Sequence, residues 1–317
     1  MILRSIELED FRNYHKARVD FDPELTVIHG HNGQGKTNLL EAIHILSFTK
    51  SMRNIREREC VRFERDRAFI NGKTEDETLE IAISLTERKL LKRGGGECST
   101  RDWLGALPAV FFGPQELNLV REGPSTRRRF LDMAICGMHP AYVSALSMYK
   151  RALEHKKKLL IDRNTDVLPE FNDILKQKGA IVADFREKYF QKLAPLAAKY
   201  YAGISSGAEV LELRYAANSL DNLDEVRELE AGQALYGPHR DDIKFLMNGR
   251  EMKSFGSQGQ VKSAAIAVKL AERQIIEREL NTAPVMLLDD VLSELDENRL
   301  YPVITTDLLQ NHLRRGV

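Results

Sequence analysis

Short stretches rich in apolar and β-branched residues, typical of β-strands, gather toward the two ends of the chain. They are residues 2–8, 25–29, 68–70, 79–85, 109–112, 209–215, 243–247 and 285–288. Residues 126–201 differ, because their apolar positions recur at helical spacing and few glycines occur. Strands at both ends with helices between them predict an α/β domain that is built from both chain ends and interrupted by a helical insertion.

The central region is expected to form two amphipathic helices. The first has a heptad pattern at Val143, Leu146, Lys150, Leu153, Lys157 and Leu160. The second follows the polar residues 162–166 and carries Phe171, Ile174, Leu175, Ile181, Val182, Phe185 and Tyr189. Two helices joined by a short polar loop are typical of an antiparallel hairpin. We therefore expect an α/β lobe at residues 1–120 and 205–317 and a helical lobe at residues 121–204.

The composition is that of a globular protein. Of 317 residues, 43% are hydrophobic and 30% charged, and 47 basic side chains balance 47 acidic ones. The net charge of zero neither favours nor excludes nucleic acid as a partner. The three cysteines lie far apart, which argues against a zinc site or a disulfide scaffold. With no signal peptide and no apolar run near ~18 residues, we expect a soluble, cytoplasmic protein without membrane contact.

The most informative motif fits the phosphate-binding pattern G-x-x-x-x-G-K-[ST], the P-loop. It consists of Gly30, His31, Asn32, Gly33, Gln34, Gly35, Lys36 and Thr37. A buried strand is predicted before it at residues 25–28 and a helix after it at residues 38–46, the order that a P-loop requires. Backbone N–H groups would then surround the phosphates, Lys36 would reach the β- and γ-phosphates, and the Thr37 hydroxyl would bind Mg²⁺. The motif predicts binding of a nucleoside triphosphate, with a chance glycine turn as the alternative.

A second part of this site is expected near the other end of the chain. The apolar residues 285–288 are followed by Asp289 and Asp290. A buried strand that delivers a carboxylate at its C-terminal end is how P-loop enzymes hold Mg²⁺. We assign Asp289 to the metal and Asp290 to polarising the attacking water. Taken without the P-loop, two adjacent acids fit a solubilising turn equally well.

A third element, residues 257–260, precedes an expected helix at residues 261–280. A serine and a glycine that open a helix can bind an anion through free N–H groups and the helix dipole. An ordinary serine N-cap explains the same residues and is the simpler interpretation of the motif in isolation.

Several further motifs occur in an order that resembles a known family. They are residues 11–14, 112–117, 123–132, 237–242, 257–260, 288–290 and 293–296. Together with the P-loop they resemble the head of ABC-type ATPases in its SMC-like branch, and closely the RecF family of bacterial recombination proteins. The motifs span nearly the whole chain, and Gly-Pro-His-Arg-Asp-Asp and Ser-Gln-Gly-Gln are more specific than the P-loop. The resemblance implies an ABC-type P-loop ATPase head with an inserted α-helical lobe.

The resemblance also implies a mechanism that needs two protomers. ABC-type heads form head-to-tail homodimers with ATP between them. Ser257 and Gly259 would therefore contact the γ-phosphate of ATP bound to the P-loop of the other protomer. Asp296 would join the dimer seam.

Two further site residues follow from the same resemblance. Gln115 would couple Mg²⁺ and water to the helical lobe, and it would act in catalysis together with Lys36 and Asp290. Arg12 would approach the nucleotide beside the P-loop.

The family binds DNA, favours duplex–single-strand junctions at gaps, and works with RecO and RecR to promote RecA loading during gap repair and the SOS response. The resemblance thus implies a weak, DNA-stimulated ATPase. Residues 121–163 contain ten Lys or Arg against four acids, and residues 50–67 contain seven against four. Such stretches suit the phosphate backbone of duplex DNA. A solvated helix face is the alternative for a charge run.

In one place the chain departs from the family's pattern. Only residues 297–303 separate Asp296 from the segment that ends in Thr305 and Thr306, where the family has a longer helix. So few residues do not allow a helix to form and the chain to return across a sheet. Effective hydrolysis is therefore left open, and so is the residue that senses the γ-phosphate. The alternatives are an ATP-binding DNA clamp without effective hydrolysis and, less favoured, a transporter ATPase subunit.

Overall fold

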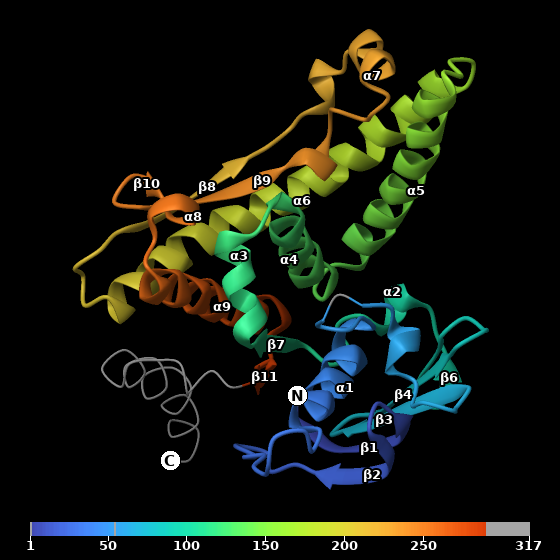
Figure 1. Cartoon of the computed structure of the whole chain (residues 1–317), viewed down its shortest axis with the longest axis vertical. Coiled ribbons are helices and arrows are strands. Elements are labelled where there is room, and N and C mark those ends of the chain that lie inside the picture. The colour runs from blue at the N-terminus through green and yellow to red at the C-terminus, as the bar shows by residue number, and fades with distance from the viewer. Residues whose placement is uncertain (1, 54, 290–317) are drawn as a thin grey trace. The chain divides into compact units, whose positions relative to one another are not determined.

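The computed structural model describes residues 2–53 and 55–289, and for Gln115 the course of the backbone alone (Figure 1). The chain has the mixed helices and sheets of an α/β protein, as expected. Within the described residues, no helix combines the length and the apolarity that a bilayer crossing demands.

The described residues form two compact units. The first comprises residues 2–116 and 272–289, and the second comprises residues 117–271. The second unit extends past the expected boundary at residue 204, because the strand that follows packs along the long helix before it. The division into functional lobes stays a prediction.

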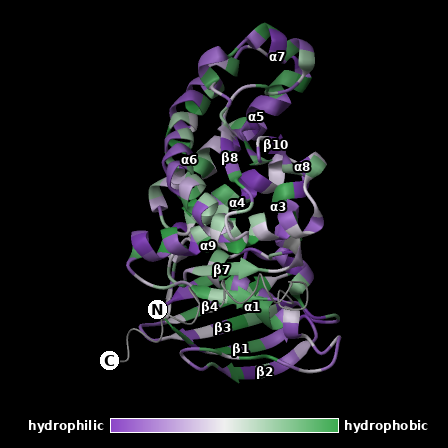
Figure 2. Cartoon of the chain, turned by 90° about the vertical axis from the view of Figure 1, so that its left-hand side faces the viewer, coloured by the Kyte–Doolittle hydropathy of each residue, from purple (hydrophilic) through white to green (hydrophobic). Residues whose placement is uncertain are grey.

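The first unit contains a six-stranded antiparallel sheet in the order β2-β1-β3-β4-β5-β6. Its strands are β1 (Leu3–Phe11), β2 (Tyr14–Asp20), β3 (Arg67–Thr74), β4 (Thr78–Ser84), β5 (Leu90–Arg93) and β6 (Gly96–Glu97). Every second side chain of β3 and β4 is buried, and Figure 2 shows hydrophobic and hydrophilic residues following one another along the sheet. The strands predicted at residues 2–8, 68–70 and 79–85 are confirmed, whereas β2 and β5 were not predicted.

Helix α1 (Lys36–Phe48) packs on this sheet. Its residues Leu39, Ile43 and Leu46 are buried in one hydrophobic core with the inward side chains of the strands. Gly72 on β3 permits the close approach of α1, because a Cβ there would lie 2.2 Å from the Leu46 side chain. Trp103, at the end of α2 (Thr100–Trp103), donates its indole N–H to the backbone oxygen of Leu46 at 2.8 Å. These contacts fix α1, and with it the P-loop, relative to the sheet.

A separate pair of strands brings together two segments that are far apart in the sequence. Strand β7 (Ala109–Phe112) runs parallel to β11 (Val285–Leu288), with Val285 opposite Ala109 (Figure 1). The backbone N–H of Asp289 extends the pairing by donating to the oxygen of Phe112 at 2.8 Å. All four residues of β7 are buried, and α1 packs against both strands. The prediction that the chain ends build one α/β unit is confirmed by this pair.

One predicted strand is not formed. Residues 25–29 are assigned no strand, and Leu25 and Val27 are 63% and 72% exposed. A β-strand needs a neighbouring strand for its backbone N–H and C=O groups. Within the described part of the chain, this segment pairs with neither β7 nor β11. The prediction of a buried strand in front of the P-loop is therefore wrong for the described structure, although the helix after the loop is confirmed.

The second unit is dominated by helices. They are α3 (Asn118–Arg121), α4 (Pro124–Cys136), α5 (Pro140–Asp162), α6 (Leu168–Ile204), α7 (Glu225–Ala231), α8 (Met252–Phe255) and most of α9 (Gln258–Leu280). Helices α5 and α6 pack against each other across a short connection, which confirms the predicted hairpin. An antiparallel sheet in the order β10-β9-β8 accompanies them. It consists of β8 (Leu211–Ala216), β9 (Asp242–Met247) and β10 (Arg250–Glu251), and β8 packs along α6.

The buried face of α5 differs from the predicted heptad pattern. Leu146, Leu153 and Leu160 are buried as expected, but the two lysine positions of the pattern are not. Instead Lys156 is fully buried, and its ammonium lies 2.5 Å from the Glu228 carboxylate on α7. Lys157 consequently points away from the core of the hairpin.

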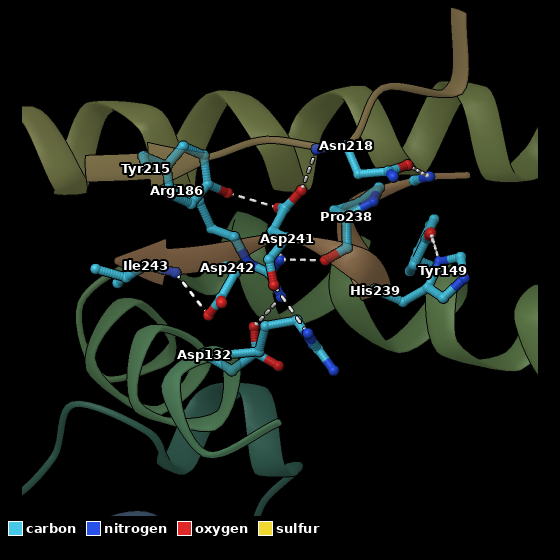
Figure 3. A network of polar contacts seen from close by, with 12 residues as sticks. Asp132, Tyr149, Arg186, Tyr215, Asn218, Pro238, His239, Asp241, Asp242 and Ile243 are labelled. Atoms are coloured by element: carbon cyan, nitrogen blue, oxygen red, sulfur yellow. Dashed lines mark hydrogen bonds and ion pairs between the residues drawn. The ribbon is translucent and has the colours of Figure 1, made fainter. Parts of the chain in front are cut away.

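A buried ionic network centred on Arg186 of α6 connects the elements of the second unit (Figure 3). Its Nη2 donates to Asp132 of α4 at 2.8 Å, and its Nη1 donates to Asp241 at 2.9 Å and to the Pro238 oxygen at 2.6 Å. Asp241 also accepts the Tyr215 hydroxyl at 2.5 Å. The guanidinium also donates through Nε to the Tyr142 hydroxyl of α5 at 3.1 Å. Helices α4, α5 and α6 and the segment just before β9 thus meet at one buried guanidinium, so part of the Gly-Pro-His-Arg-Asp-Asp motif has a structural task.

The charges in this network compensate one another. Burial alone would raise the pKa of Asp132, but the charges of Arg186 and Lys150 and the Tyr142 hydroxyl outweigh burial and hold that pKa below its ordinary value. Asp132 is therefore ionised at neutral pH, and removing Arg186 would leave two buried carboxylates without their common partner.

Substituting Arg186→Ala is expected to lower the free energy of unfolding by ~3–5 kcal/mol, since breaking a buried ion pair strands the remaining charges. Urea denaturation followed by circular dichroism measures the change. The matched control is Lys188→Ala on the same helix, whose exposed pair with Asp184 should contribute at most about 0.5 kcal/mol. Equal effects of the two substitutions would contradict the structural role assigned to Arg186.

Candidate nucleotide-binding site

The P-loop residues form a turn that leads directly into α1. Gly30, Gly33 and Gly35 have φ angles of 149°, 82° and 103°, in the region that favours glycine. Gly35 is the N-cap of α1 and gives it no side-chain hydrogen bond. The free N–H groups of the first turn and the positive end of the helix dipole are therefore available to an anion.

Lys36 folds back over this turn. Its ammonium donates to the backbone oxygens of Gly30 at 2.7 Å and His31 at 2.9 Å. The side chain of Gln34 closes the turn by accepting the N–H of His31 at 3.1 Å. The lysine charge thus lies at the carbonyl oxygens of the loop for which the motif predicts phosphate binding.

Thr37 and Asp289 meet although 252 positions separate them in the sequence. The Thr37 hydroxyl donates to Asp289 Oδ1 at 3.1 Å. Asp289 directly follows β11, and Thr37 lies in the first turn of α1, which packs against β11. A hydroxyl and a carboxylate oxygen in contact are the hard ligands that Mg²⁺ prefers, so these residues fit the metal assigned to them.

Gln115 lies in the short 3₁₀ helix Pro114–Leu117, just after β7. Because β7 and β11 are parallel neighbours, Gln115 and Asp289 follow the same edge of this pair. The backbone of Gln115 thus follows β7 at the same end of the strand pair at which Asp289 follows β11. Its catalytic role stays a prediction.

Arg12 is engaged with Glu41 of α1. Its Nε and Nη2 donate to the two oxygens of that carboxylate at 3.0 and 2.8 Å, and its Nη1 donates to the Glu59 oxygen at 3.0 Å. All three guanidinium nitrogens therefore already have protein acceptors. The expected approach of Arg12 to the nucleotide stays a prediction, and in this structure Arg12 braces the helix of the P-loop.

Glu41 is fully buried and accepts several hydrogen bonds. Burial alone would raise its pKa, but hydrogen bonds from Arg12 and Ser51 and the charges of Arg12 and Arg53 outweigh burial and lower it. Next to it, burial and the charge of Glu41 raise the pKa of the Cys60 thiol to about 12, so this cysteine stays protonated. Glu41 is thus an ionised anchor for the turn that carries Arg12.

Asn13, in the turn after β1, and Tyr14, the first residue of β2, both hold the P-loop, a role that the sequence did not predict. Asn13 Nδ2 donates to the Gln34 oxygen at 3.1 Å, and the Tyr14 hydroxyl donates to the Gly35 oxygen at 3.1 Å. Asn38 of α1 in turn donates to Asn13 Oδ1 at 2.8 Å. The only signal in the sequence was the motif at residues 11–14, which by itself does not reveal these partners.

Ser257 and Gly259 belong to the second unit, at the start of α9. Ser257 Oγ accepts the N–H of Gln260 at 3.2 Å, and Gln260 Oε1 accepts the N–H of Ser257 at 2.8 Å. This reciprocal pair is a capping box, so the N-cap interpretation is confirmed. Ser257 and Gly259 are exposed, and their contact with a nucleotide of another protomer stays a prediction. Asp290 and Asp296 lie outside the described residues.

Replacing Asn13 with alanine should weaken ATP binding. The change removes the hydrogen bond to Gln34 of the P-loop, worth ~0.5–1.5 kcal/mol, and we expect the Kd for ATP to rise about 3- to 10-fold. Isothermal titration calorimetry measures the Kd. Lys16→Ala, an exposed position near the same turn, is the control and should leave the Kd unchanged. An unaltered Kd in Asn13→Ala would show that the turn does not support the loop.

The buried Glu41 should make stability depend on pH. Because its folded pKa is lowered, the ionised group stabilises the fold fully above its unfolded pKa of about 4.3, and this contribution is lost as pH falls further. Glu41→Gln should therefore cost ~1–3 kcal/mol at pH 7 and less below pH ~4. Urea midpoints at both pH values test this, with the exposed Glu24→Gln as control. A difference that stays constant with pH would contradict the assignment.

Comparisons with known proteins agree with this geometry. Residues 2–312 match the family described as RecF/RecN/SMC N terminal domain. The DNA replication and repair protein RecF of Bacillus subtilis (strain 168) is 38% identical over 326 residues, which cover 94% of this chain and 88% of that protein. The RecF protein of Agathobacter rectalis is 37% identical over 317 residues, covering 94% and 87%.

Solved structures give the same result. The structure described as the recombination mediator protein RecF-ATP in the RecFOR pathway has a TM-score of 0.90 and 32% identity, over 96% of this chain and 89% of that one. An Smc head domain from Pyrococcus furiosus, with a TM-score of 0.52 and 18% identity, shares the fold alone. The ABC-type ATPase fold is therefore established. By sequence and by structure, this chain belongs to the RecF family of DNA replication and repair proteins.

Proposed function

We propose that this protein binds ATP and Mg²⁺ at the P-loop, forms an ATP-dependent head-to-tail homodimer on DNA, and hydrolyses ATP slowly during recombinational repair. The observation that carries the proposal is the contact between Thr37 and Asp289 beside the lysine of the loop. The similar structure whose description names RecF-ATP supports the choice of nucleotide.

The residues of the first unit have separate tasks in this proposal. The amides of residues 30–35 and the N-terminus of α1 hold the phosphates, and Lys36 exchanges the carbonyls of Gly30 and His31 for phosphate oxygens. Thr37 and Asp289 hold Mg²⁺, with Gln115 nearby on the neighbouring strand end. When bound, Mg²⁺ neutralises charge on the β- and γ-phosphates. Asp290, next to the metal ligand in sequence, orients the attacking water.

Dimerisation completes the site. Ser257 and Gly259 are exposed at the N-terminus of α9, a position whose free N–H groups and dipole suit the γ-phosphate of ATP on a second protomer. ATP then supplies the charge that holds two faces together, and hydrolysis removes that charge. Asp296 belongs to the same seam in this proposal.

DNA binding is assigned to the basic stretch at residues 121–163. Some of its cations are used within the unit, among them Arg127, Lys150 and Lys156, which pair with Asp242, Asp132 and Glu228. Exposed cations of the stretch, such as Arg151 and Lys158, offer charge to the phosphate backbone of duplex DNA and of duplex–single-strand junctions. By family membership, RecO and RecR are the protein partners, and RecA loading and the SOS response are the cellular context.

Steady-state ATP hydrolysis against protein concentration, with and without duplex DNA, tests the proposal. Activity per protomer should rise with concentration and be stimulated by DNA, because the site needs two chains. Activity per protomer that is constant and indifferent to DNA would contradict the dimeric site. ATP binding without turnover would instead identify a DNA clamp without effective hydrolysis.

A mixing experiment provides the control for the same test. Lys36→Ala removes the phosphate-binding lysine. Ser257→Arg places a bulky side chain on the surface that is proposed to contact the ATP of the other protomer. Each variant alone should therefore be inactive. A mixture should regain activity, because a mixed dimer contains one site with both Lys36 and Ser257 intact. A mixture that stays inactive would mean that the two residues do not act across the dimer.

A further inference from the structure

The second unit contains a basic cavity that the nucleotide site does not use. It has a volume of about 510 Å³ and lies where α4 and α5 face residues 232–240. Its lining includes Arg128 of α4, Lys157 of α5 and Arg240, and it contains no carboxylate. Three cations therefore converge on one cavity without an acid among its walls.

The two arginines are held by neutral acceptors. Arg128 donates to the backbone oxygen of Asp241 at 2.8 Å, and Arg240 donates to the oxygen of Ala234 at 3.0 and 2.7 Å. These bonds orient the guanidinium groups through neutral oxygens. Burial, followed by the charge of Arg186, lowers the pKa of Arg128, although the charges of Asp242, Asp241 and Asp132 act in the opposite direction. Lys157 pairs with the exposed Glu154 at 2.7 Å.

His239 lines the cavity, and its ring lies next to the Tyr149 hydroxyl (Figure 3). Its Nε2 lies 3.1 Å from the oxygen of Ala234, which can only accept, so Nε2 carries the proton and Nδ1 accepts the Tyr149 hydroxyl at 2.6 Å. Burial and then the charges of Arg240, Lys157 and Arg128 lower the pKa of His239 to about 4. The imidazole is thus neutral at physiological pH, and all three cations act on it.

We propose that this cavity binds a phosphate group of the DNA backbone through Arg128, Lys157 and Arg240. The inference deepens the proposed function, because it rests on DNA binding by the helical region. Two of the three cations lie in the basic stretch at residues 121–163, and Arg240 is exposed. The lining has apolar Leu153 and Ile161 but no Phe, Tyr or Trp on which a base would stack, which favours backbone over base recognition.

The test is the salt dependence of duplex binding, measured by fluorescence anisotropy with ATP present. The double variant Lys157→Gln/Arg240→Gln removes two cations and leaves Arg128, which supports Asp241, in place. The slope of log K against log salt should fall by about 2, and binding should weaken equally for duplexes of different sequence. The control is Lys176→Gln/Arg227→Gln, which removes two exposed charges of the same unit outside the cavity and should keep the wild-type slope.

A slope equal to wild type in the double variant overturns the cavity as a phosphate site but leaves the proposed function standing, since DNA is still bound. Failure of the wild-type protein to bind duplex DNA would instead overturn the proposed function. Unfolding midpoints show whether the double variant is folded. If it is not, Lys157→Gln alone is measured instead, and its slope should fall by about 1.

The source of the phosphate is distinguished by NMR of the His239 ring. A bound phosphodiester should raise its pKa, because the anion offsets the three cations, so duplex DNA should shift its titration toward higher pH. If inorganic phosphate alone causes the shift and duplex DNA does not, the cavity holds a free phosphate and the assignment to the DNA backbone is overturned.

Discussion

The parallel pairing of β7 with β11 is the contact on which the nucleotide site depends. It places Asp289 directly after β11, in contact with Thr37 on the helix that packs against the same pair. A shift of one residue in the pairing would turn the carboxylate to the other face. The proposed metal ligands Thr37 and Asp289 therefore come together only when the segment around residue 285 has joined the N-terminal part of the chain. Folding of this unit and assembly of the site are one event.

Charge is handled in two opposite ways in the second unit. Arg186 is buried with Asp132 and Asp241, so its charge is compensated and serves to join helices and strands. Arg128 and Arg240 are oriented by backbone carbonyl oxygens instead, and both line the basic cavity. The motif at residues 237–242 contributes to both arrangements, since Asp241 belongs to the buried network and Arg240 to the cavity. One short segment thus contributes both to the buried network and to the basic cavity.

The sequence predicted those features whose residues are contiguous. The P-loop, its helix, the strand before Asp289 and the helical hairpin follow from local patterns, and they are formed. Features that depend on contacts between distant segments were missed or wrong. Residues 25–29 have a strand-like pattern but pair with neither β7 nor β11 in the described structure. The bonds of Asn13, the pairing of Arg12 with Glu41 and the burial of Lys156 depend on partners that only the fold brings near.

Gly35 limits which amino-acid substitutions related chains can accept at this position. A Cβ at this position would lie 2.6 Å from Asn13 Nδ2 and 3.0 Å from the Tyr14 hydroxyl. The space that a side chain would need is already filled by the turn after β1, and the φ angle of 103° also disfavours any other residue. Smaller residues at positions 13 and 14 would free the space but would not change the φ angle. Position 35 should therefore stay glycine among related chains, whatever residues stand at positions 13 and 14.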